Sequence, residues 1–262
     1  EVTATDLPEL DVTDPGAVAA AVARVRPDAV AHLAAWTAVD DCEADPARAQ
    51  RVNGEAAGHV ARAAAAAGAR LLHVSTDYVF DGEKDGAYVE DDPVAPLSAY
   101  GRSKLAGEQA VRSACGDARI VRCQSIYGAG RKSFPDAILA RARSGEPLCV
   151  VTDQVVCPSY AEDVAGALRA VLERAPAGTY HAANAGHCTW YELARAVLDE
   201  SGLDAVPIAE TTAAALGRPA RRPASSRFSC ARLEAAAGVR MRHWREALRD
   251  YLALERAAEA SA

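Results

Sequence analysis

The sequence of 262 residues has no apolar run that approaches the roughly 20 residues of a membrane-spanning helix, although half of its residues are hydrophobic. It shows no signal peptide. It also has no excess of positive charge, because its net charge is -7, and this argues against a general nucleic-acid binder. We therefore expect a soluble protein that binds neither a membrane nor a nucleic acid.

The chain has seven cysteines, an odd number, and none of them forms a Cys-x-x-Cys pair. Such a set argues against a disulfide framework and against a zinc site. No group of histidine, cysteine and carboxylate residues stands at ligand spacing either, so we predict no catalytic metal. The cysteines are best explained as buried thiols of a reducing compartment, which places the protein in the cytoplasm.

One stretch, from Ser75 to Lys104, carries the strongest functional signal. It follows Arg70–Val74, a short apolar and β-prone segment that predicts a buried strand. This strand delivers Ser75 and Thr76 at its carboxyl end, which is the edge where ligands bind in open α/β sheets.

A helix is predicted shortly after this strand. Pro93 and Pro96 interrupt the chain, and Ser98 can cap the alanine-rich helix that follows. Tyr100 and Lys104 then stand four residues apart on one face of that helix.

This arrangement suits the reduction of a ketone. A phenol has a pKa of about 10 and is a poor proton donor at neutral pH, but an ammonium one helical turn away favours the phenolate and lowers that pKa. Tyr100 can then protonate the alkoxide that forms, while Thr76 hydrogen-bonds the same oxygen and Lys104 reaches a cofactor ribose. A Tyr-x-x-x-Lys pair alone is more often a solvated helix face, so the prediction depends on the strand-end threonine.

The two motifs carry a resemblance to a known family. Ser75–Gly82 reads Ser-Thr-Asp-Tyr-Val-Phe-Asp-Gly, and Tyr100–Lys104 reads Tyr-Gly-Arg-Ser-Lys. Together they resemble the extended short-chain dehydrogenase/reductases and, within them, the dTDP-4-dehydrorhamnose reductase family. The resemblance implies a catalytic triad of Thr76, Tyr100 and Lys104, the cofactor NADPH or NADH, and a nucleotide-diphosphate sugar as substrate.

The beginning of the chain is unusual for such a fold. Glu1–Asp6 already reads as a strand, Asp14 and Pro15 predict the start of a helix, and 28–35 reads as another buried strand. A dinucleotide-binding fold normally begins one unit earlier, with a strand and a glycine-rich turn, and nothing here matches that turn. We expect that the natural chain begins earlier, and the alternative is a loss of normal cofactor binding.

Several residues are candidates for contacts with the cofactor. An acidic residue at the end of the second strand, here Asp6, accepts hydrogen bonds from the ribose of NAD and repels the 2′-phosphate of NADP, with a turn aspartate as the equal alternative. By the resemblance, Asp11 and Val12 lie near the adenine, and Ala34 and Ala35 form a small-residue turn beside the cofactor. The full predicted set is Asp6, Asp11, Val12, Ala34, Ala35, Tyr100 and Lys104.

Substrate contacts are predicted mainly in two basic segments, one at residues 131–132 and one at residues 218–223. Arg131 and Lys132 precede a helix that Ser133 can cap, which suits an anionic diphosphate. Arg222 belongs to the densest basic run of an acidic protein, 218–223, and its guanidinium suits the same diphosphate. A solvated basic loop is the alternative in both places. The full predicted set is Tyr78, Ser125, Arg131, Lys132 and Arg222.

Two departures from the family pattern bear on the substrate. The family usually has a tryptophan where this chain has Ser125, and a glycine where it has Val156. The loss of a large stacking surface favours a different sugar or a different pose. The leading hypothesis is NAD(P)H-dependent reduction of the C4 ketone of a 4-keto-6-deoxy nucleotide sugar, such as dTDP-4-dehydrorhamnose. The alternatives are a reductase or epimerase of another nucleotide sugar and a non-catalytic regulatory subunit of the same fold.

Strands that alternate with helices predict an α/β fold, a doubly wound parallel sheet of Rossmann type with a smaller C-terminal substrate lobe. We place the dinucleotide-binding domain at 1–128 and the substrate-binding lobe at 129–262, with a segment at about 150–175 packing back on the sheet. Further strands are predicted at 118–123 and 178–182. A homodimer stays open as the assembly state.

Three further predictions concern structure and not chemistry. A long helix should follow Asp45, and Asn53 within it should tie the helix to a neighbouring loop. Thr189 and Glu192 form a capping box that opens another helix. His181 lies one residue inside a strand and is more often a core residue than a base.

Overall fold

The computed structural model describes residues 1–130 and 132–260, and a four-stranded parallel sheet lies at its centre. The strand order is β1-β2-β3-β8. Every residue of β3 is buried, as expected for a strand of a parallel sheet that is covered on both faces. The strands are β1 (Ala29–His32), β2 (Arg70–Thr76), β3 (Ala118–Cys123) and β8 (Gly178–Ala182).

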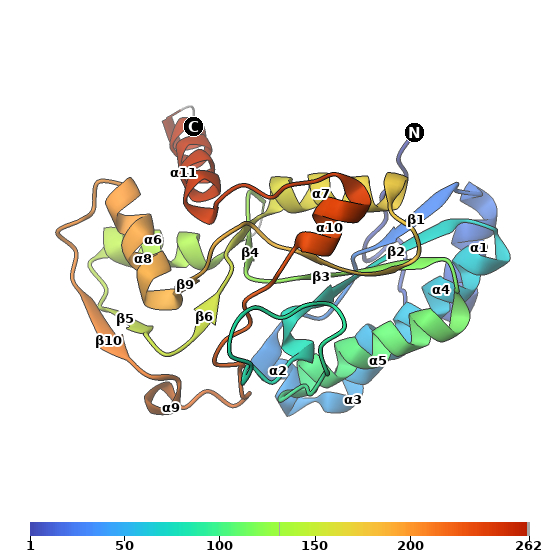
Figure 1. The fold of residues 1–262 in the computed structure, drawn as a ribbon, viewed down its shortest axis with the longest axis horizontal. Helices are drawn as coiled ribbons and strands as arrows, with labels where there is room; N and C mark the ends of the chain where they lie inside the picture. Colours follow the sequence, from blue (N-terminus) through green and yellow to red (C-terminus); the bar gives the residue numbers. More distant parts are fainter. Residues whose placement is uncertain (131, 261–262) are drawn as a thin grey trace.

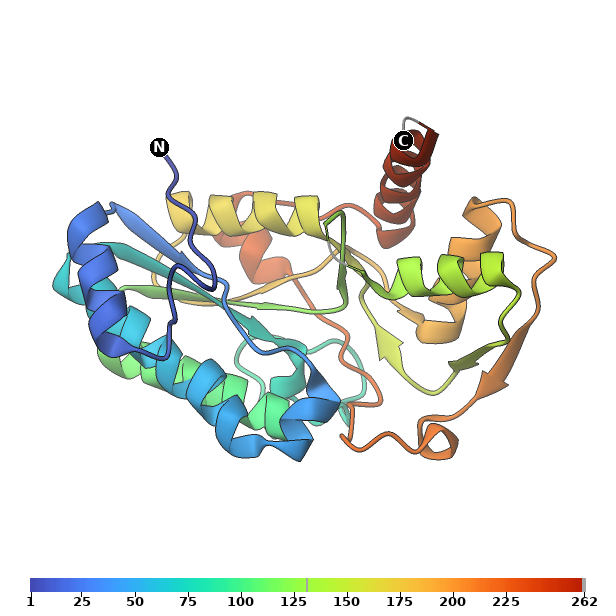
Figure 2. The ribbon, with the colours of Figure 1, turned by 180° about the vertical axis from the view of Figure 1, so that it is seen from behind.

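Helices cover both faces of this sheet (Figure 1, Figure 2). One face carries α1, α4 and α5, whose apolar side chains share a core with β2 and β3. The other face carries α7 and α10, which share a second core with the same two strands. This arrangement confirms the predicted doubly wound α/β fold. The helices are α1 (Pro15–Val25), α4 (Ala56–Ala66), α5 (Ala99–Ala114), α7 (Ala161–Arg174) and α10 (Ala231–Ala237).

The predicted elements around Tyr100 are confirmed. β3 and β8 have the predicted bounds, β1 lies within the predicted 28–35, and β2 carries the chain through Thr76. The hydroxyl of Ser98 caps α5, since it accepts a hydrogen bond from the Gly101 N–H at 3.2 Å. Tyr100 therefore lies in the first turn of α5, beside the end of β2.

The beginning of the chain departs from the prediction. Glu1–Asp6 forms no strand and its residues are exposed, so the predicted strand is wrong. A strand is stable only where its backbone groups pair with a neighbour, and β1, at the edge of the sheet, pairs with β2 alone among the described residues. The predicted helix start is confirmed, because the Asp14 carboxylate accepts hydrogen bonds from the N–H groups of Gly16 and Ala17.

The long helix predicted after Asp45 contains a wide π-helical turn, η1 (Gln50–Glu55). The turn carries Asn53, whose side-chain oxygen accepts a hydrogen bond from the Trp36 N–H at 2.8 Å and whose amide donates to the Ser103 hydroxyl at 3.0 Å. Asn53 thus ties this helix to the loop after β1 and to α5, which confirms its predicted structural role.

A smaller region lies at the other end of the molecule (Figure 1). Its strands β5 and β10 form a parallel pair, and α6, α8 and α11 pack around a separate core. Ser133 and Thr189 form capping boxes at the starts of α6 and α8, so the predicted box at Thr189 is confirmed. The elements are β5 (Leu148–Val151), β10 (Ile208–Thr211), α6 (Phe134–Ser144), α8 (Trp190–Glu200) and α11 (Trp244–Ala260).

Short strands join the two regions. β4 pairs with β7 in parallel, and β6 pairs with β9 antiparallel. α7 follows β7 and packs on the main sheet, whereas β5 belongs to the smaller region, and the division at residue 128 stays a prediction. The remaining elements are β4 (Ile126–Tyr127), β6 (Val155–Val156), β7 (Ser159–Tyr160), β9 (Cys188–Thr189), α2 (Val39–Ala44), α3 (Pro46–Ala49), α9 (Ala213–Leu216) and η2 (Asp77–Val79).

Burial of His181 and of most cysteines follows the predictions. Five of the seven free cysteines are buried, but Cys149 is exposed and Cys230 is half-buried. His181 is buried and its ring stacks on Phe228 with centroids 3.9 Å apart, so its core position is confirmed. Within the described ranges, no helix is both long and apolar enough to span a bilayer, and no cluster of three or more potential metal ligands occurs.

Candidate active site

A cavity of about 680 Å³ opens at the carboxyl ends of β1, β2 and β3, and we call it the main cavity. This is the edge at which open parallel sheets bind their ligands. Thr76 at the end of β2 and both Tyr100 and Lys104 from α5 line it. The structure therefore brings the predicted catalytic side chains together.

A glycine allows α5 to approach the end of β2. A Cβ atom at Gly101 would lie 2.2 Å from the backbone oxygen of Tyr78, a distance that no real side chain tolerates. The first turn of α5 can therefore lie directly on η2, which follows β2. This contact places the Tyr100 phenol beside Thr76, within hydrogen-bonding reach of its hydroxyl.

The hydroxyl of Thr76 sits in a local network. It donates a hydrogen bond to the Asp77 carboxylate at 3.0 Å and accepts one from the Tyr78 N–H at 3.2 Å. The second bond caps η2, and the β conformation of Thr76 permits it. The turn after β2 thus fixes the direction of the hydroxyl toward the cavity wall.

The pKa of Tyr100 departs from the prediction. Burial raises this pKa above its ordinary value, because a phenolate loses its hydration inside the cavity wall, and the hydrogen bond with Thr76 offsets only part of the rise. We expected Lys104 to lower the pKa, and the shift has the opposite direction. The Tyr78 ring lies edge-on to Tyr100 with centroids 5.5 Å apart and adds to the burial.

Lys104 is 3% exposed, and its ammonium donates a hydrogen bond to the backbone oxygen of Val74 at 2.7 Å. Burial lowers the pKa of Lys104 to about 8, while the nearby Glu108 carboxylate opposes this shift. The carbonyl of Val74 therefore holds the ammonium in the wall of the main cavity. Two of its three N–H donors are left for other partners.

Most predicted substrate residues also meet in the main cavity. Tyr78, Ser125, Lys132 and Arg222 line it, together with Val156. Arg131 lies outside the described residues. Position 125 therefore contributes only the small side chain of serine to the cavity wall.

The predicted cofactor residues divide into two groups. Ala35 lines the main cavity, as do Tyr100 and Lys104. Asp6, Asp11, Val12 and Ala34 are not among its lining residues. Asp6 accepts a hydrogen bond from the Leu7 N–H and Asp11 from the Thr13 N–H, so each carboxylate stabilises a local turn. Their contacts with a cofactor stay predictions.

Sequence reasoning missed a buried polar cluster in the cavity wall. Asp77 is 6% exposed, and its carboxyl group hydrogen-bonds the side chain of Ser226 as well as that of Thr76. Gln124 holds Ser226 in place by donating to its backbone oxygen at 2.7 Å. Burial raises the pKa of Asp77 to about 6. Asp77 belongs to the Ser-Thr-Asp motif, but the residues near it in the sequence do not predict that Ser226 contacts it.

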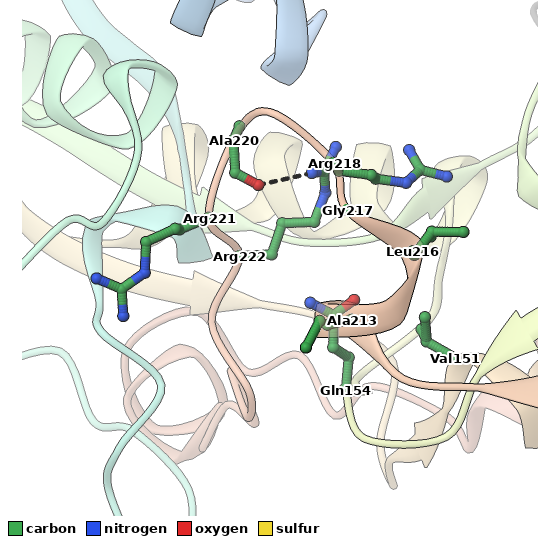
Figure 3. Close-up of a pocket in the computed structure, with 10 residues that line it drawn as sticks. Val151, Gln154, Ala213, Leu216, Gly217, Arg218, Ala220, Arg221 and Arg222 are labelled. Carbon is green, nitrogen blue, oxygen red and sulfur yellow. Dashed lines mark hydrogen bonds between the residues drawn. The ribbon is translucent and has the colours of Figure 1, made fainter.

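A second, smaller cavity of about 300 Å³ adjoins the main one, and we call it the arginine cavity. Arg218, Arg221 and Arg222 line it, and Figure 3 shows Arg218 and Arg221 extending to opposite sides of the loop that carries them. Gln154 and Arg222 line both cavities. This loop belongs to residues 217–229, which we call the return segment because it leads from α9 back to α10 at the main sheet (Figure 1).

The guanidinium of Arg222 is already engaged. It donates to both carboxylate oxygens of Asp40 in α2 and to the backbone oxygen of Ala220, the bond drawn in Figure 3, and it hydrogen-bonds the Tyr78 side chain. An arginine has five N–H donors, so few remain for a substrate diphosphate. Arg218 approaches the same Asp40 carboxylate at 3.7 Å.

A parallel sheet with a strand-end threonine beside a Tyr-x-x-x-Lys helix defines a protein of the short-chain dehydrogenase/reductase class. Within that class, the family described as the RmlD substrate binding domain matches residues 1–257, and the chain belongs to this family. It is 43% identical to the dTDP-4-dehydrorhamnose reductase of Streptomyces griseus over 95% of this chain and 84% of that protein. It is 42% identical to a probable dTDP-4,6-dihydroxy-2-methyloxan-3-one 4-ketoreductase of Streptomyces antibioticus, over 95% and 85% of the two chains.

Solved structures agree with this family. The fold matches a dTDP-4-dehydrorhamnose reductase of Clostridium acetobutylicum with a TM-score of 0.92 and 35% identity, over 96% of this chain and 89% of that one. It matches the Bacillus anthracis dTDP-4-dehydrorhamnose reductase, solved in complex with NADP, with a TM-score of 0.91 and 32% identity, over 95% and 88%.

Proposed function

We propose that this protein reduces the C4 ketone of a 4-keto-6-deoxy nucleotide sugar, such as dTDP-4-dehydrorhamnose, with NADPH or NADH. The observation that carries this proposal is the convergence of Thr76, Tyr100 and Lys104 in one cavity at the strand ends. The names of the relatives in Streptomyces griseus and Clostridium acetobutylicum support the same reaction.

Each residue of the triad has a role in this proposal. A bound NAD(P)H supplies the hydride. Tyr100 donates its phenolic proton to the oxygen that becomes an alkoxide, and its raised pKa keeps that proton in place until the negative charge develops. Thr76 orients the ketone oxygen, and Lys104 holds the cofactor ribose with the donors that Val74 leaves free.

The main cavity fits the nicotinamide end of the cofactor. Ala35 presents a methyl group only, Lys104 is a buried donor, and both lie where β1 and β2 end. We assign the adenine end to Asp6, Asp11, Val12 and Ala34, and dinucleotide binding as a whole to residues 1–128. The NADP complex of the Bacillus anthracis relative supports this class of cofactor.

The substrate is assigned to the smaller region, 129–262, and to the edge of the main cavity. Lys132 and Arg222 bring positive charge to this cavity in a protein whose net charge is -7. Tyr78, Ser125, Arg131, Lys132 and Arg222 remain the proposed contacts, with the sugar near Tyr78 and Ser125 and the diphosphate near the cations.

A second candidate is reduction or epimerisation of another nucleotide sugar. Ser125 and Val156 both line the main cavity, and both depart from the family pattern. The relative in Streptomyces antibioticus bears the name of a ketoreductase for a different sugar.

We also propose that the protein is cytoplasmic and forms a homodimer. Light scattering of the purified protein tests the homodimer.

The experiment that tests the function is a panel of nucleotide keto-sugars with NADPH and with NADH. Oxidation of the cofactor is followed optically and the product is identified by NMR. Turnover of the 4-keto-6-deoxy sugar and no other supports the leading proposal. Turnover of a different keto-sugar supports the second candidate, and no turnover with any pair rejects both.

A further inference from the structure

The Thr76 hydroxyl has one proton and at least two acceptors competing for it. The Asp77 carboxylate takes that proton at 3.0 Å in this structure. A ketone oxygen is a weaker acceptor than an ionised carboxylate. While Asp77 is ionised, Thr76 therefore cannot donate a hydrogen bond to a substrate ketone.

The situation reverses when Asp77 carries a proton. Thr76 already accepts one hydrogen bond, from the Tyr78 N–H, and one lone pair is left when the Tyr100 phenol donates to the ketone and not to Thr76. A protonated Asp77 can donate to that lone pair. The hydroxyl proton of Thr76 is then free to point at the ketone oxygen, so the bonds run from Asp77 through Thr76 to the substrate.

We propose that Asp77 is a positioning residue whose protonated form turns the Thr76 hydroxyl toward the substrate ketone and whose ionised form turns it away. The inference rests on the proposed function, since it assigns a ketone to the main cavity. Asp77 lines the main cavity, so it lies close enough to the proposed substrate site to take part in this way.

The groups around Asp77 do not titrate in the same pH range as Asp77 itself. The titratable groups that face it are Tyr78 and Tyr100, Cys123 at the end of β3 and Cys157 in the turn between β6 and β7. Burial raises the pKa of each, to about 12 for Tyr78, Cys123 and Cys157. All of them stay neutral between pH 5 and 8.

Burial also raises the pKa of Asp77 to about 6, against the hydrogen bonds from Ser226 and Thr76, which lower it. The protonated fraction therefore falls about 50-fold between pH 6 and pH 8. The pKa of Lys104 in the same cavity is lowered to about 8, so its titration gives a separate and higher transition.

The first test is the pH profile of kcat/KM for ketone reduction between pH 5 and 9. In the wild type, the rate should rise as the pH falls toward 6 and then level off. Asp77→Asn keeps the shape of the side chain and always offers an N–H to Thr76, so the lower transition should vanish and the rate at pH 7 should approach the wild-type rate at pH 5. Asp41→Asn, on the exposed surface of α2, is the matched control and should keep the wild-type profile.

Ser226→Ala gives a test that retains the carboxyl group. Removing a hydrogen bond that favours the ionised form should raise the pKa of Asp77 and move the lower transition to higher pH. If Asp77 had only a structural role, Ser226→Ala would not shift the pH profile of kcat/KM. A lower transition that is the same in the wild type, Asp77→Asn and Ser226→Ala would overturn the proposal.

The second test needs no turnover. Infrared difference titration of the protein follows the C=O band of a protonated carboxylic acid, and Asp77→Asn identifies the band that belongs to Asp77. Thr76→Val removes the hydroxyl that stabilises the ionised form, so the midpoint of this band should move to higher pH. An unchanged midpoint would sink the coupling of Asp77 to Thr76, even if the keto-sugar panel supports the reaction. A shifted midpoint supports the coupling even if the panel rejects the substrate.

Discussion

Arg222 spreads its guanidinium over both carboxylate oxygens of Asp40, at 2.9 and 3.1 Å, although 182 positions separate the two residues in the chain. The pair fastens the return segment to α2 beside the main cavity. The same carboxylate accepts a hydrogen bond from the Ala220 N–H at 3.1 Å. Asp40 therefore fixes two residues of the return segment, Ala220 and Arg222.

Replacing Asp40 by Asn should loosen this loop. The substitution leaves the half-buried Arg222 without its counter-charge, and we expect the free energy of unfolding to fall by about 1–2 kcal/mol. Denaturant unfolding measures this loss. Asp41→Asn removes the neighbouring charge from the exposed surface of the same helix and should cost almost nothing. Equal losses in the two variants would contradict the role of Asp40.

Replacing Gly101 by Ala should displace α5. The added methyl group would lie 2.2 Å from the backbone oxygen of Tyr78, so the first turn of the helix must move away from η2. We expect a destabilisation of about 1–3 kcal/mol, together with a loss of turnover because Tyr100 moves with the turn. Gly116→Ala is the control, since a Cβ there meets nothing within 4 Å. A Gly101→Ala protein with normal stability and turnover would show that the close approach is unimportant.

Replacing Lys104 by Met should stabilise the fold while abolishing turnover. The pKa of Lys104 falls from 10.5 to about 8 on folding, so the folded protein binds this proton less tightly than the unfolded chain does. The charged lysine therefore opposes folding below pH 8, by an amount on the order of 3 kcal/mol for such a shift. The gain in the variant should be largest below pH 8 and should shrink as the pH rises toward 10.5.

Thermal melts of the two proteins across this range measure the effect. A Lys104→Met protein that is less stable than the wild type at pH 7 would mean that the bond to the Val74 oxygen outweighs the cost of burying the charge.

Replacing Tyr100 by Phe removes the proposed proton donor and little else. The phenyl ring keeps the contact with Tyr78, so the cavity wall should stay in place. Turnover should fall by about 10²–10⁴-fold, while the affinity for the cofactor, measured by fluorescence titration, stays nearly the same. Turnover at the wild-type rate would reject Tyr100 as the donor.

Local patterns predicted the centre of the site because its parts are local. The strand before Thr76, the cap at Ser98 and the helical spacing of Tyr100 and Lys104 depend on neighbouring residues only, and all of them appear in the structure. The strand predicted at Glu1–Asp6 failed because a strand depends on a partner that its own sequence does not specify.

Long-range effects were beyond the sequence. The partner of Arg222 is Asp40 on a distant helix, and the partners of Asp77 include Ser226 from the return segment. The direction of the shift in the Tyr100 pKa depends on burial by residues from several elements, so helical spacing alone gave the wrong sign. These long-range contacts and this burial exist only in the folded chain, so local sequence patterns do not show them.

The central claim is that the cavity around Thr76, Tyr100 and Lys104 directs a hydride to the C4 carbonyl of a nucleotide sugar. The most direct measurement uses NADPH deuterated at its transferable position together with dTDP-4-dehydrorhamnose, and locates the label in the product by NMR. The account predicts one deuterium at C4 of the sugar with the wild-type protein and almost none with Tyr100→Phe. Label at another carbon, or no transfer of deuterium from NADPH, would contradict it.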